Sequence, residues 1–261
     1  MKFGMPTLVE CENIFECIDV AKANGLDFIE INQSFPQYLP DALSISELRS
    51  VMKSKNIFFT IHADEQLNPF DFNKDVSRCY FDVMRKSIQF ALNLDIPVIN
   101  MHLLKGVYVT LPEKVILLTD VYFDEYIARV KEFVKMCEEE IGDGNLKICI
   151  ENVDSNPFTT SQIEALKIFM ASPVFALTLD VGHEICLGMK DSFVFSEYAE
   201  KLCHMHLHDS DGKKPHLALG VGVIDVDEKI KKLGDGTCLI EVKTIVGLEQ
   251  SVKYLREKGY M

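Results

Sequence analysis

Long hydrophobic runs, low-complexity segments and internal repeats are all missing from this chain. No apolar stretch approaches the ~20 residues of a membrane span, so we expect no membrane partner. The amino-terminal residues MKFGMPTLVE lack the apolar core of a secretory leader and predict a first strand instead. No linker or shift in composition divides the 261 residues, so a single domain spanning residues 1–261 is expected.

Cysteine pairing motifs are also missing. The eight cysteines include no C-x-x-C pair, and most of them lie within apolar helix or strand patterns. Such cysteines are typical of reduced thiols packed in a protein core. We therefore expect a reducing compartment and a cytoplasmic location for this protein.

Positive charge is scarce relative to negative charge. The chain has 27 lysine and arginine residues against 40 aspartate and glutamate residues, which gives a formal net charge of −13 at pH 7. A surface of this kind repels polyanions, so nucleic acid is not an expected partner. The alternative is that the acidity carries no functional information, because many cytosolic proteins are acidic.

What the sequence does contain is a regular alternation of strand and helix patterns. Eight short strand patterns are each followed by a helical pattern, which is typical of a parallel sheet with crossover helices. Eight such units in 261 residues predict an α/β protein with a (β/α)8 barrel, or TIM barrel. An open doubly wound sheet is the alternative, but no glycine-rich phosphate turn follows the first strand. The predicted strands are Lys2–Leu8, Phe28–Asn32, Phe58–His62, Pro97–His102, Leu146–Glu151, Val174–Asp180, Leu202–His208 and Thr237–Val242. The predicted helices are Asn13–Ala23, Ser46–Ser54, Asp75–Leu94, Tyr122–Glu140, Ser161–Met170, Phe193–Lys201, Val226–Leu233 and Leu248–Lys258.

Histidines concentrate in one stretch, Leu202–Gly222, which holds four of the seven histidines of the chain. His204, His206 and His208 alternate along the predicted strand, so they share one face. Burying an imidazole without hydrogen-bond partners costs about 1–3 kcal/mol, and imidazole is the commonest metal-ligating side chain. Taken alone, this stretch is compatible with a metal site and with a hydrogen-bonded polar strand end.

Six of the eight predicted strands carry, at or near their carboxyl ends, a residue that can bind a metal ion. The carboxyl ends of the strands are where barrel active sites are built. The remaining histidines, His183 and His216, follow the sixth and seventh strands, and no histidine falls in a predicted helix. Each residue alone could be a hydrogen-bonding group at the barrel mouth. The set favours a metal site, because converging carboxylates need a divalent cation nearby. The six strand-end residues are His62, His102, Glu151, Asp180, His206 and Glu241.

The alternation of side chains along the strands agrees with this interpretation. With Glu151 pointing into the barrel, Ile150 points outward toward the helices. With Asp180 pointing inward, Leu179 likewise points outward. Polar residues near the mouth and apolar residues against the helices are what an occupied barrel mouth requires.

The strand-end residues lie within longer motifs, namely IENVDSNP at 150–157, LTLDVGHE at 177–184, HMHLHDSDGKKPHLALGVG at 204–222 and LIEVK at 239–243. Together, and in this order, these motifs resemble the xylose isomerase-like TIM-barrel superfamily. That superfamily includes sugar isomerases, sugar epimerases and enzymes of the endonuclease IV type. The resemblance covers nearly the whole chain and is much less specific for the substrate.

The resemblance implies roles for individual residues. In the epimerase branch it implies one divalent metal ion held by Glu151, Asp180, His206 and Glu241. The two glutamates would also act as catalytic acid and base on opposite faces of the substrate carbon, and His183 would contact the substrate. In the endonuclease branch, three zinc ions use these positions together with His62, His102 and an Asp-x-His motif in the seventh loop.

This chain departs from the endonuclease pattern at two places. Lys214-Pro215-His216 stands where the Asp-x-His motif is expected, and Val221 replaces the glutamate of the usual LGEG motif. A protonated lysine has no lone pair to offer a metal ion. We therefore expect at most two tightly held ions, with His183 and His216 free to bind substrate oxygens and Lys214 facing a substrate phosphate or carboxylate. The alternative is that Lys214 points into solvent and that water completes the shell of a third ion.

The function that these residues favour is a divalent-metal-dependent isomerase or epimerase acting on a sugar or a sugar phosphate. A bound Mn²⁺, Co²⁺, Mg²⁺ or Zn²⁺ ion would supply Lewis-acid polarisation of the substrate carbonyl and an adjacent hydroxyl, and the mixed ligand set does not choose among these metals. Glu151 or Glu241 would remove the proton next to the carbonyl to give an enediolate, and the other glutamate would return a proton. Return to the same carbon gives epimerisation, and return to the neighbouring carbon gives isomerisation.

Two other functions remain open from the sequence. A multi-zinc phosphoesterase of the endonuclease IV type is favoured by His62 and His102 and opposed by the net charge and the missing aspartate. A barrel reused as a small-molecule binder or regulator is opposed by the intact pair of glutamates. In the favoured case the partner is a small-molecule carbohydrate. The sequence does not name the sugar, and it leaves open whether the chain forms a homo-oligomer.

Nucleic-acid cleavage separates the first two functions. With a formal net charge of −13 and no basic stripe interleaved with aromatic residues, we expect weak binding to duplex DNA and no incision at abasic sites. The measurement is a nicking assay on an abasic duplex at catalytic protein concentration, with added Mn²⁺ or Zn²⁺. Metal-dependent nicking would rank the phosphoesterase ahead of the isomerase.

Overall fold

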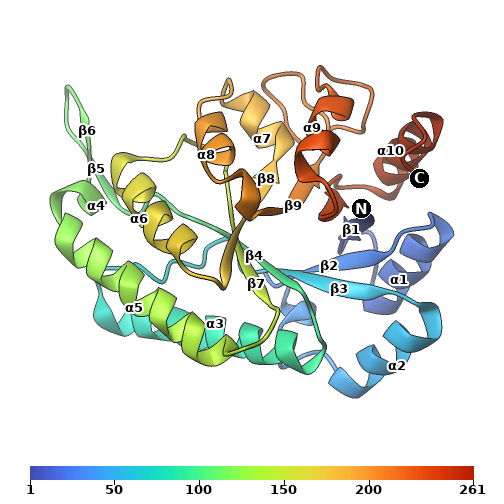
Figure 1. The fold of residues 1–261 in the computed structure, drawn as a ribbon, viewed down its shortest axis with the longest axis horizontal. Coiled ribbons are helices and arrows are strands. Elements are labelled where there is room, and N and C mark those ends of the chain that lie inside the picture. Colours follow the sequence, from blue (N-terminus) through green and yellow to red (C-terminus); the bar gives the residue numbers. More distant parts are fainter.

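The computed structural model describes residues 1–261, and its centre is a closed barrel of eight parallel strands (Figure 1). Each barrel strand pairs with the next barrel strand along the chain, and β10 pairs with β1 to close the barrel. The predicted (β/α)8 barrel is therefore confirmed, as one domain. The barrel strands are β1 (Lys2–Pro6), β2 (Phe28–Asn32), β3 (Phe58–His62), β4 (Val98–His102), β7 (Lys147–Glu151), β8 (Phe175–Asp180), β9 (Leu202–Leu207) and β10 (Thr237–Ile240). A separate antiparallel hairpin, β5 (Tyr108–Thr110) and β6 (Val115–Leu117), projects from the loop after β4 (Figure 1).

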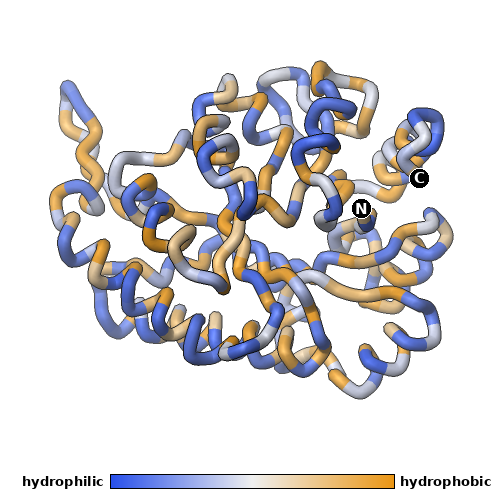
Figure 2. The backbone as a smooth tube through the Cα atoms, in the orientation of Figure 1, coloured by the Kyte–Doolittle hydropathy of each residue, from blue (hydrophilic) through white to orange (hydrophobic).

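Helices surround the barrel and connect its strands (Figure 1). Local signals start them, as at α6, where Thr159 and Gln162 form a reciprocal capping box. Hydrophilic segments lie mainly on the outer helices and turns in Figure 2. None of the helices is both long and apolar enough to cross a membrane. The helices are α1 (Ile14–Ala23), α2 (Ile45–Lys55), α3 (Lys74–Asn93), α4 (Leu118–Val121), α5 (Phe123–Ile141), α6 (Thr160–Ala171), α7 (Val181–Cys186), α8 (Ser192–Glu197), α9 (Val226–Leu233) and α10 (Ile245–Glu257).

The barrel separates a polar interior at its mouth from an apolar layer beneath the helices. Glu151 on β7 lies 3.1 Å from His206 on β9, although β8 separates these strands, so both side chains point into the barrel. Their neighbours Ile150 and Leu207 are fully buried in the apolar core. The predicted alternation of inward polar and outward apolar residues is thus confirmed at these strands.

Three local features differ from the prediction. Residues 181–186 form α7 directly after β8, so His183 lies in a helix, and the prediction that no histidine is helical is wrong. The reason is Asp180, which ends the strand and also caps the helix by accepting the backbone N–H of His183 at 2.6 Å. The predicted helix Phe193–Lys201 is instead α8 followed by a 3-10 turn, and the hairpin β5–β6 was not predicted.

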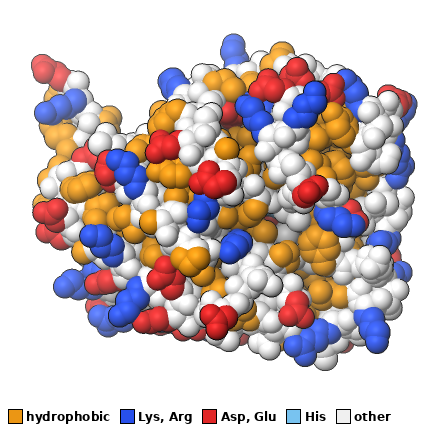
Figure 3. Space-filling model, in the orientation of Figure 1, with side chains coloured by type: hydrophobic (Ala, Val, Ile, Leu, Met, Phe, Trp, Pro, Cys, Tyr) orange, Lys and Arg blue, Asp and Glu red, His pale blue; other side chains and the backbone are white.

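The outer surface mixes charges of both signs. On the face shown in Figure 3, acidic and basic side chains are interspersed rather than gathered into a basic stripe. The projecting hairpin carries exposed apolar residues, among them Val109 and Val115. This face therefore offers no extended positive surface for a polyanion.

A single carboxylate organises the loop that follows β9. The side chain of Asp209 is buried and accepts hydrogen bonds at 2.9–3.1 Å from the backbone N–H groups of Ser210, Gly220, Gly222 and Ile224. A Cβ atom at residue 222 would collide with this carboxylate, which explains the glycine there. Asp209 therefore fixes the path of the loop that returns to the barrel mouth.

Replacing Asp209 by alanine would leave four N–H groups without their acceptor. Because each unpaired buried group costs about 1–3 kcal/mol, we expect Asp209→Ala to lower the free energy of unfolding by about 3 kcal/mol or more. The measurement is urea-induced unfolding followed by circular dichroism. Asp211→Ala is the matched control, because Asp211 is exposed on the same loop and accepts two backbone N–H groups. Similar losses in the two variants would contradict the special role of Asp209.

Candidate metal centre and active site

Four side chains from four strands converge at the carboxyl end of the barrel. Glu151 ends β7 and Asp180 ends β8, while His206 lies near the end of β9 and Glu241 directly follows β10. His206 Nδ1 lies 3.1 Å from both Glu151 Oε1 and Glu241 Oε2. Asp180 Oδ2 lies 3.8 Å from the same nitrogen. All four residues are buried, and one ligand atom from each lies within 4.8 Å of the others.

The geometry of this group fits a divalent cation. Ligand atoms that share one ion at bond lengths of about 2.1 Å lie about 3.0–3.4 Å apart, and the contacts of His206 Nδ1 with Glu151 and Glu241 fall in that range, while Asp180 Oδ2 lies farther away at 3.8 Å. Glu241 Oε2 is buried and has no hydrogen-bond partner. A buried carboxylate oxygen without a donor is costly unless a cation or a ligand faces it. Three carboxylates and an imidazole suit Mn²⁺, Co²⁺, Mg²⁺ or Zn²⁺.

Glu151 also faces a second pair of histidines. Its Oε2 atom lies 3.4 Å from His62 Nε2 and 3.3 Å from His102 Nε2. His62 Nδ1 donates to the carbonyl oxygen of Ala63 at 2.7 Å, which leaves Nε2 for the site. Asn100 donates to the same Glu151 oxygen. Glu151 thus lies between two groups of potential ligands.

Neighbouring positive charges keep the two glutamates ionised. Burial raises the pKa of Glu151, but the charges of His206 and His102 outweigh burial and hold that pKa well below its usual range. Burial also raises the pKa of Glu241, and His206 and Lys243 together bring it well below its usual range. Both side chains are therefore carboxylates at neutral pH, as a ligand or a general base must be.

The carboxylates in turn raise the pKa values of the histidines that they contact. Burial lowers the pKa of His206, but Glu151 and Glu30 raise it well above its usual value. Burial likewise lowers the pKa of His62, and the hydrogen bond and charge of Glu151 raise it to about 9. Burial lowers the pKa of His216 to about 4. In the metal-free protein, protons on His62 and His206 thus supply the positive charge that a cation would bring.

Glu30 is a buried acidic residue that the prediction omitted. Its Oε2 atom accepts from Thr60 at 2.9 Å and from His204 Nε2 at 3.0 Å. Its Oε1 atom lies 3.0 Å from His206 Nε2, in a direction that makes no hydrogen bond. Glu30 therefore faces His206 from the ring edge opposite Glu151 and Glu241. The strand FIEIN contains the signal, because a glutamate between two isoleucines points away from the face that they share.

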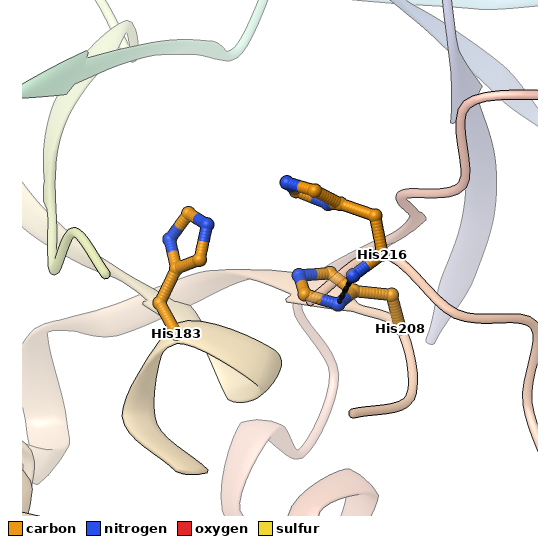
Figure 4. Close-up of side chains that lie close together, drawn as sticks. All are labelled: His183, His208 and His216. Atoms are coloured by element: carbon orange, nitrogen blue, oxygen red, sulfur yellow. Dashed lines mark hydrogen bonds between the residues drawn. The ribbon is translucent and has the colours of Figure 1, made fainter. Parts of the chain in front are cut away.

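Three further histidines lie together beside this centre (Figure 4). The ring centroids of His183 and His216 are 5.3 Å apart, and those of His208 and His216 are 4.3 Å apart. His183 Nδ1 donates to the carbonyl oxygen of Asn152 at 3.1 Å, and His216 Nδ1 donates to that of Glu241 at 3.3 Å. The Nε2 atoms of His183 and His216 remain available to a ligand. The prediction named these two residues and gave His208 no role.

Two cavities reach the centre. The larger, of about 500 Å³, is lined by His102 and His183 among mostly polar residues. The smaller, of about 270 Å³, is lined by His62, Glu241 and Lys243 among others. Walls of amide, hydroxyl and charged groups suit a ligand rich in hydroxyl groups.

Lys214 does not join these groups. Its side chain is exposed on the loop after β9, and its backbone N–H donates to Asp211 at 2.7 Å. Lys243 is the lysine next to the centre, with Nζ 2.7 Å from Glu241 Oε1. Lys243 is the last residue of the LIEVK motif, and the sequence predicted no role for it.

The fold and the residues at its strand ends define a TIM barrel with a carboxylate-rich site at the mouth. The chain belongs to the xylose isomerase-like TIM barrel family, whose family model matches residues 18–258. The uncharacterized protein MJ1311 of Methanocaldococcus jannaschii is 28% identical and covers 98% of this chain and 89% of its own. MJ1614 of the same organism is 24% identical and covers 78% of this chain and 79% of its own.

The solved structures with similar folds include sugar epimerases. A D-tagatose 3-epimerase-like protein shares 26% identity at a TM-score of 0.75, covering 98% of this chain and 96% of that chain. D-Psicose 3-epimerase from Clostridium cellulolyticum H10 shares 16% identity at a TM-score of 0.74, covering 100% and 99%. The 3-keto-D-glucoside 4-epimerase YcjR from E. coli shares 15% identity at a TM-score of 0.77, covering 98% and 99%. At 15–16% identity the likeness establishes the fold alone.

Metal binding should release protons from this centre. A bound cation must displace the proton of His206, and its charge would also repel the proton of the neighbouring His62, so affinity for Mn²⁺ or Zn²⁺ should rise with pH toward about 9, the pKa of His62. We expect release of about one proton or more per ion at pH 7, measured by calorimetry in buffers of different ionisation enthalpy. Binding should also raise the melting temperature.

Cys79→Ser is the background for this experiment, because Cys79 is the exposed thiol that could bind Zn²⁺ adventitiously. A protein that shows neither a thermal shift nor proton release with either metal would contradict the metal centre.

Proposed function

We propose that this protein is a divalent-metal-dependent isomerase or epimerase that acts on a sugar or a sugar phosphate. The observation that carries the proposal is the pairing of Glu151 and Glu241, whose oxygens each lie 3.1 Å from His206 Nδ1. Two ionised carboxylates next to one substrate site are what removal and return of a carbon-bound proton require. The likeness to a D-tagatose 3-epimerase-like protein at 26% identity supports this reaction class.

The metal ion would be held by Glu151, Asp180, His206 and Glu241. When bound, it supplies Lewis-acid polarisation of substrate oxygens, which lowers the pKa of the neighbouring C–H group. Neighbouring side chains fix the positions of two of these ligands by hydrogen bonds. Asn100 donates to Glu151, and Lys243 donates to Glu241 Oε1 at 2.7 Å, so the remaining carboxylate oxygens face the site.

Glu151 and Glu241 would exchange the proton with the substrate carbon. One carboxylate removes the proton next to the carbonyl, and the other returns a proton from its own side. Both groups come from fixed strand ends, so their separation does not depend on a mobile loop. The chain therefore supplies a rigid acid and base pair for either epimerisation or isomerisation.

The substrate would be oriented by groups at the rim of the site. The Nε2 atoms of His183 and His216 are free to bind substrate oxygens, because backbone carbonyl groups occupy both Nδ1 atoms. The polar walls of the two cavities would bind further hydroxyl groups. Lys214, exposed on the neighbouring loop, would meet a phosphate or carboxylate on a longer substrate.

A second candidate function rests on a different observation. Glu151 Oε2 faces His62 and His102 at 3.4 and 3.3 Å, so these three residues could hold a second ion. A pair of bound ions would supply positive charge for a phosphate group, so a phosphoesterase of the endonuclease IV type is the alternative. The acidic net charge and the absence of an aspartate at position 214 weigh against it.

Proton exchange with solvent tests the proposed reaction. In deuterated water with Mn²⁺, the wild-type protein should incorporate deuterium into at least one member of a ketose and ketose phosphate panel, detected by mass spectrometry. Glu151→Gln and Glu241→Gln should each lower the exchange rate by about a hundredfold or more, because a neutral amide cannot accept the proton. Glu249→Gln is the matched control, since Glu249 is exposed on α10, and it should exchange like wild type.

Two outcomes would contradict the mechanism. If either glutamine variant kept the wild-type rate on an identified substrate, the two-glutamate exchange would be wrong. If the panel showed no exchange while a phosphate diester was hydrolysed with Zn²⁺, the phosphoesterase would replace the isomerase.

A further inference from the structure

His208 is a fully buried histidine to which the proposed function gives no role. It directly follows β9, and its ring packs against Gly182 in α7, where any Cβ atom would collide with the imidazole. One ligand atom from His183, His208 and His216 lies within 4.8 Å of the others, so distance alone would allow a metal ion among the three rings. The hydrogen bonds of His208 decide whether it is a ligand.

The backbone N–H of His216 fixes the tautomer of His208. It donates to His208 Nδ1 at 2.7 Å, the contact dashed in Figure 4. Because a backbone N–H is always a donor, Nδ1 must offer a lone pair, and the ring proton must lie on Nε2. The carbonyl oxygen of Asp209, 3.3 Å from Nδ1, is the more distant neighbour and can receive no proton from it.

The proton on Nε2 points to Asp180. Nε2 lies 3.0 Å from both carboxylate oxygens of Asp180, which is the geometry of a bifurcated hydrogen bond. Asp180 Oδ1 also accepts the backbone N–H of His183, and the Asp180 backbone exchanges two hydrogen bonds with the Asn152 side chain at 2.9 Å. Since Nδ1 is occupied and Nε2 carries a proton, His208 has no lone pair for a metal ion.

We infer that His208 is a positioning residue, which orients the Asp180 carboxylate toward the proposed metal centre and ties it to the loop at His216. The rings of His183, His208 and His216 then do not form a further metal site. This inference rests on the proposed function, because it concerns a ligand of the proposed ion. Hydrogen-bond partners behind a metal ligand typically change metal affinity 10–100-fold.

The backbone of His216 has an unfavourable conformation, and the hydrogen bond to His208 helps to hold it. His216 has a φ of +61°, a left-handed conformation that a residue with a side chain adopts infrequently. It is held between the bond to His208 and the paired backbone groups of Asp209 and Leu217 at 2.8 and 3.0 Å. The same contact therefore fixes a metal ligand and a substrate-facing histidine.

Two amide substitutions test the two ring nitrogens separately. In His208→Asn, the amide oxygen lies near the Nδ1 position and can accept from His216, but no donor reaches Asp180. In His208→Gln, the amide nitrogen lies near the Nε2 position and can donate to Asp180, but the His216 N–H loses its acceptor. We expect the asparagine variant to bind Mn²⁺ about 10–100-fold more weakly by calorimetry, and the glutamine variant to stay within about threefold of wild type.

Two readouts independent of metal affinity complete the test. Hydrogen exchange of the His216 amide should become faster in His208→Gln and should stay slow in His208→Asn. In the Zn²⁺-loaded wild-type protein, long-range nitrogen correlation spectra should show His208 as the neutral tautomer protonated on Nε2. The wild-type spectrum decides the ligand question even if a variant does not fold.

The outcomes separate this inference from the function on which it rests. Wild-type protein that binds no Mn²⁺ or Zn²⁺ would refute the metal centre itself. Wild-type protein that binds the metal, with equal loss of affinity in both variants, would refute the role of His208 alone. A metal-bound Nε2 in the spectrum, or loss of one whole equivalent of metal in both variants, would make His208 a ligand and overturn the inference.

Discussion

The constraint on which this structure depends is the burial of four carboxylates around one imidazole. Oxygens of Glu30, Glu151 and Glu241 lie 3.0–3.1 Å from His206, and Asp180 lies slightly farther away. Like charges in a low-dielectric interior repel strongly, so each carboxylate needs a cation or a hydrogen-bond donor nearby. The inward residues near the barrel mouth are therefore polar, and the apolar core is displaced to the layer between strands and helices. A bound divalent ion would relieve the same repulsion more completely than protonated histidines do.

The surrounding fold holds these groups in place through its own buried polar contacts. The side chain of Asn152, directly after β7, pairs with the backbone of Asp180, at the end of β8. Helix α7 is in turn tied to α9 by a buried ion pair, with Lys229 Nζ 2.7 Å from Glu184. Breaking such a pair by removing one partner is strongly destabilising, because it leaves an uncompensated buried charge. The site is thus built on a network whose parts restrain one another, which favours a preorganised centre.

Much of the fold and most of the candidate site could be predicted because a parallel barrel brings the residues at its strand ends close together. All strands of such a barrel present their carboxyl ends at one rim, so residues such as Glu151 and Glu241, 90 positions apart, must meet there. Strand ends are visible in sequence, and the side-chain period of two tells which neighbours point inward. The six candidate residues at the strand ends therefore followed from the strand pattern, whereas their division into a four-residue group and the pair His62 and His102 came from the family resemblance.

The features that could not be predicted depend on the path of the chain outside the strands. The acceptor role of His208 requires the N–H of His216, eight residues later, which reaches it only because Asp209 gathers four N–H groups of the intervening loop. No periodicity encodes that path. Helix α7 was concealed because Asp180 both ends a strand and caps a helix. The strand pattern does not specify the substrate for the same reason, since both cavities are lined largely by residues from loops, which vary more than strands do. Variation of the loops can thus change what binds at the mouth of such a barrel while the strand-end residues stay fixed.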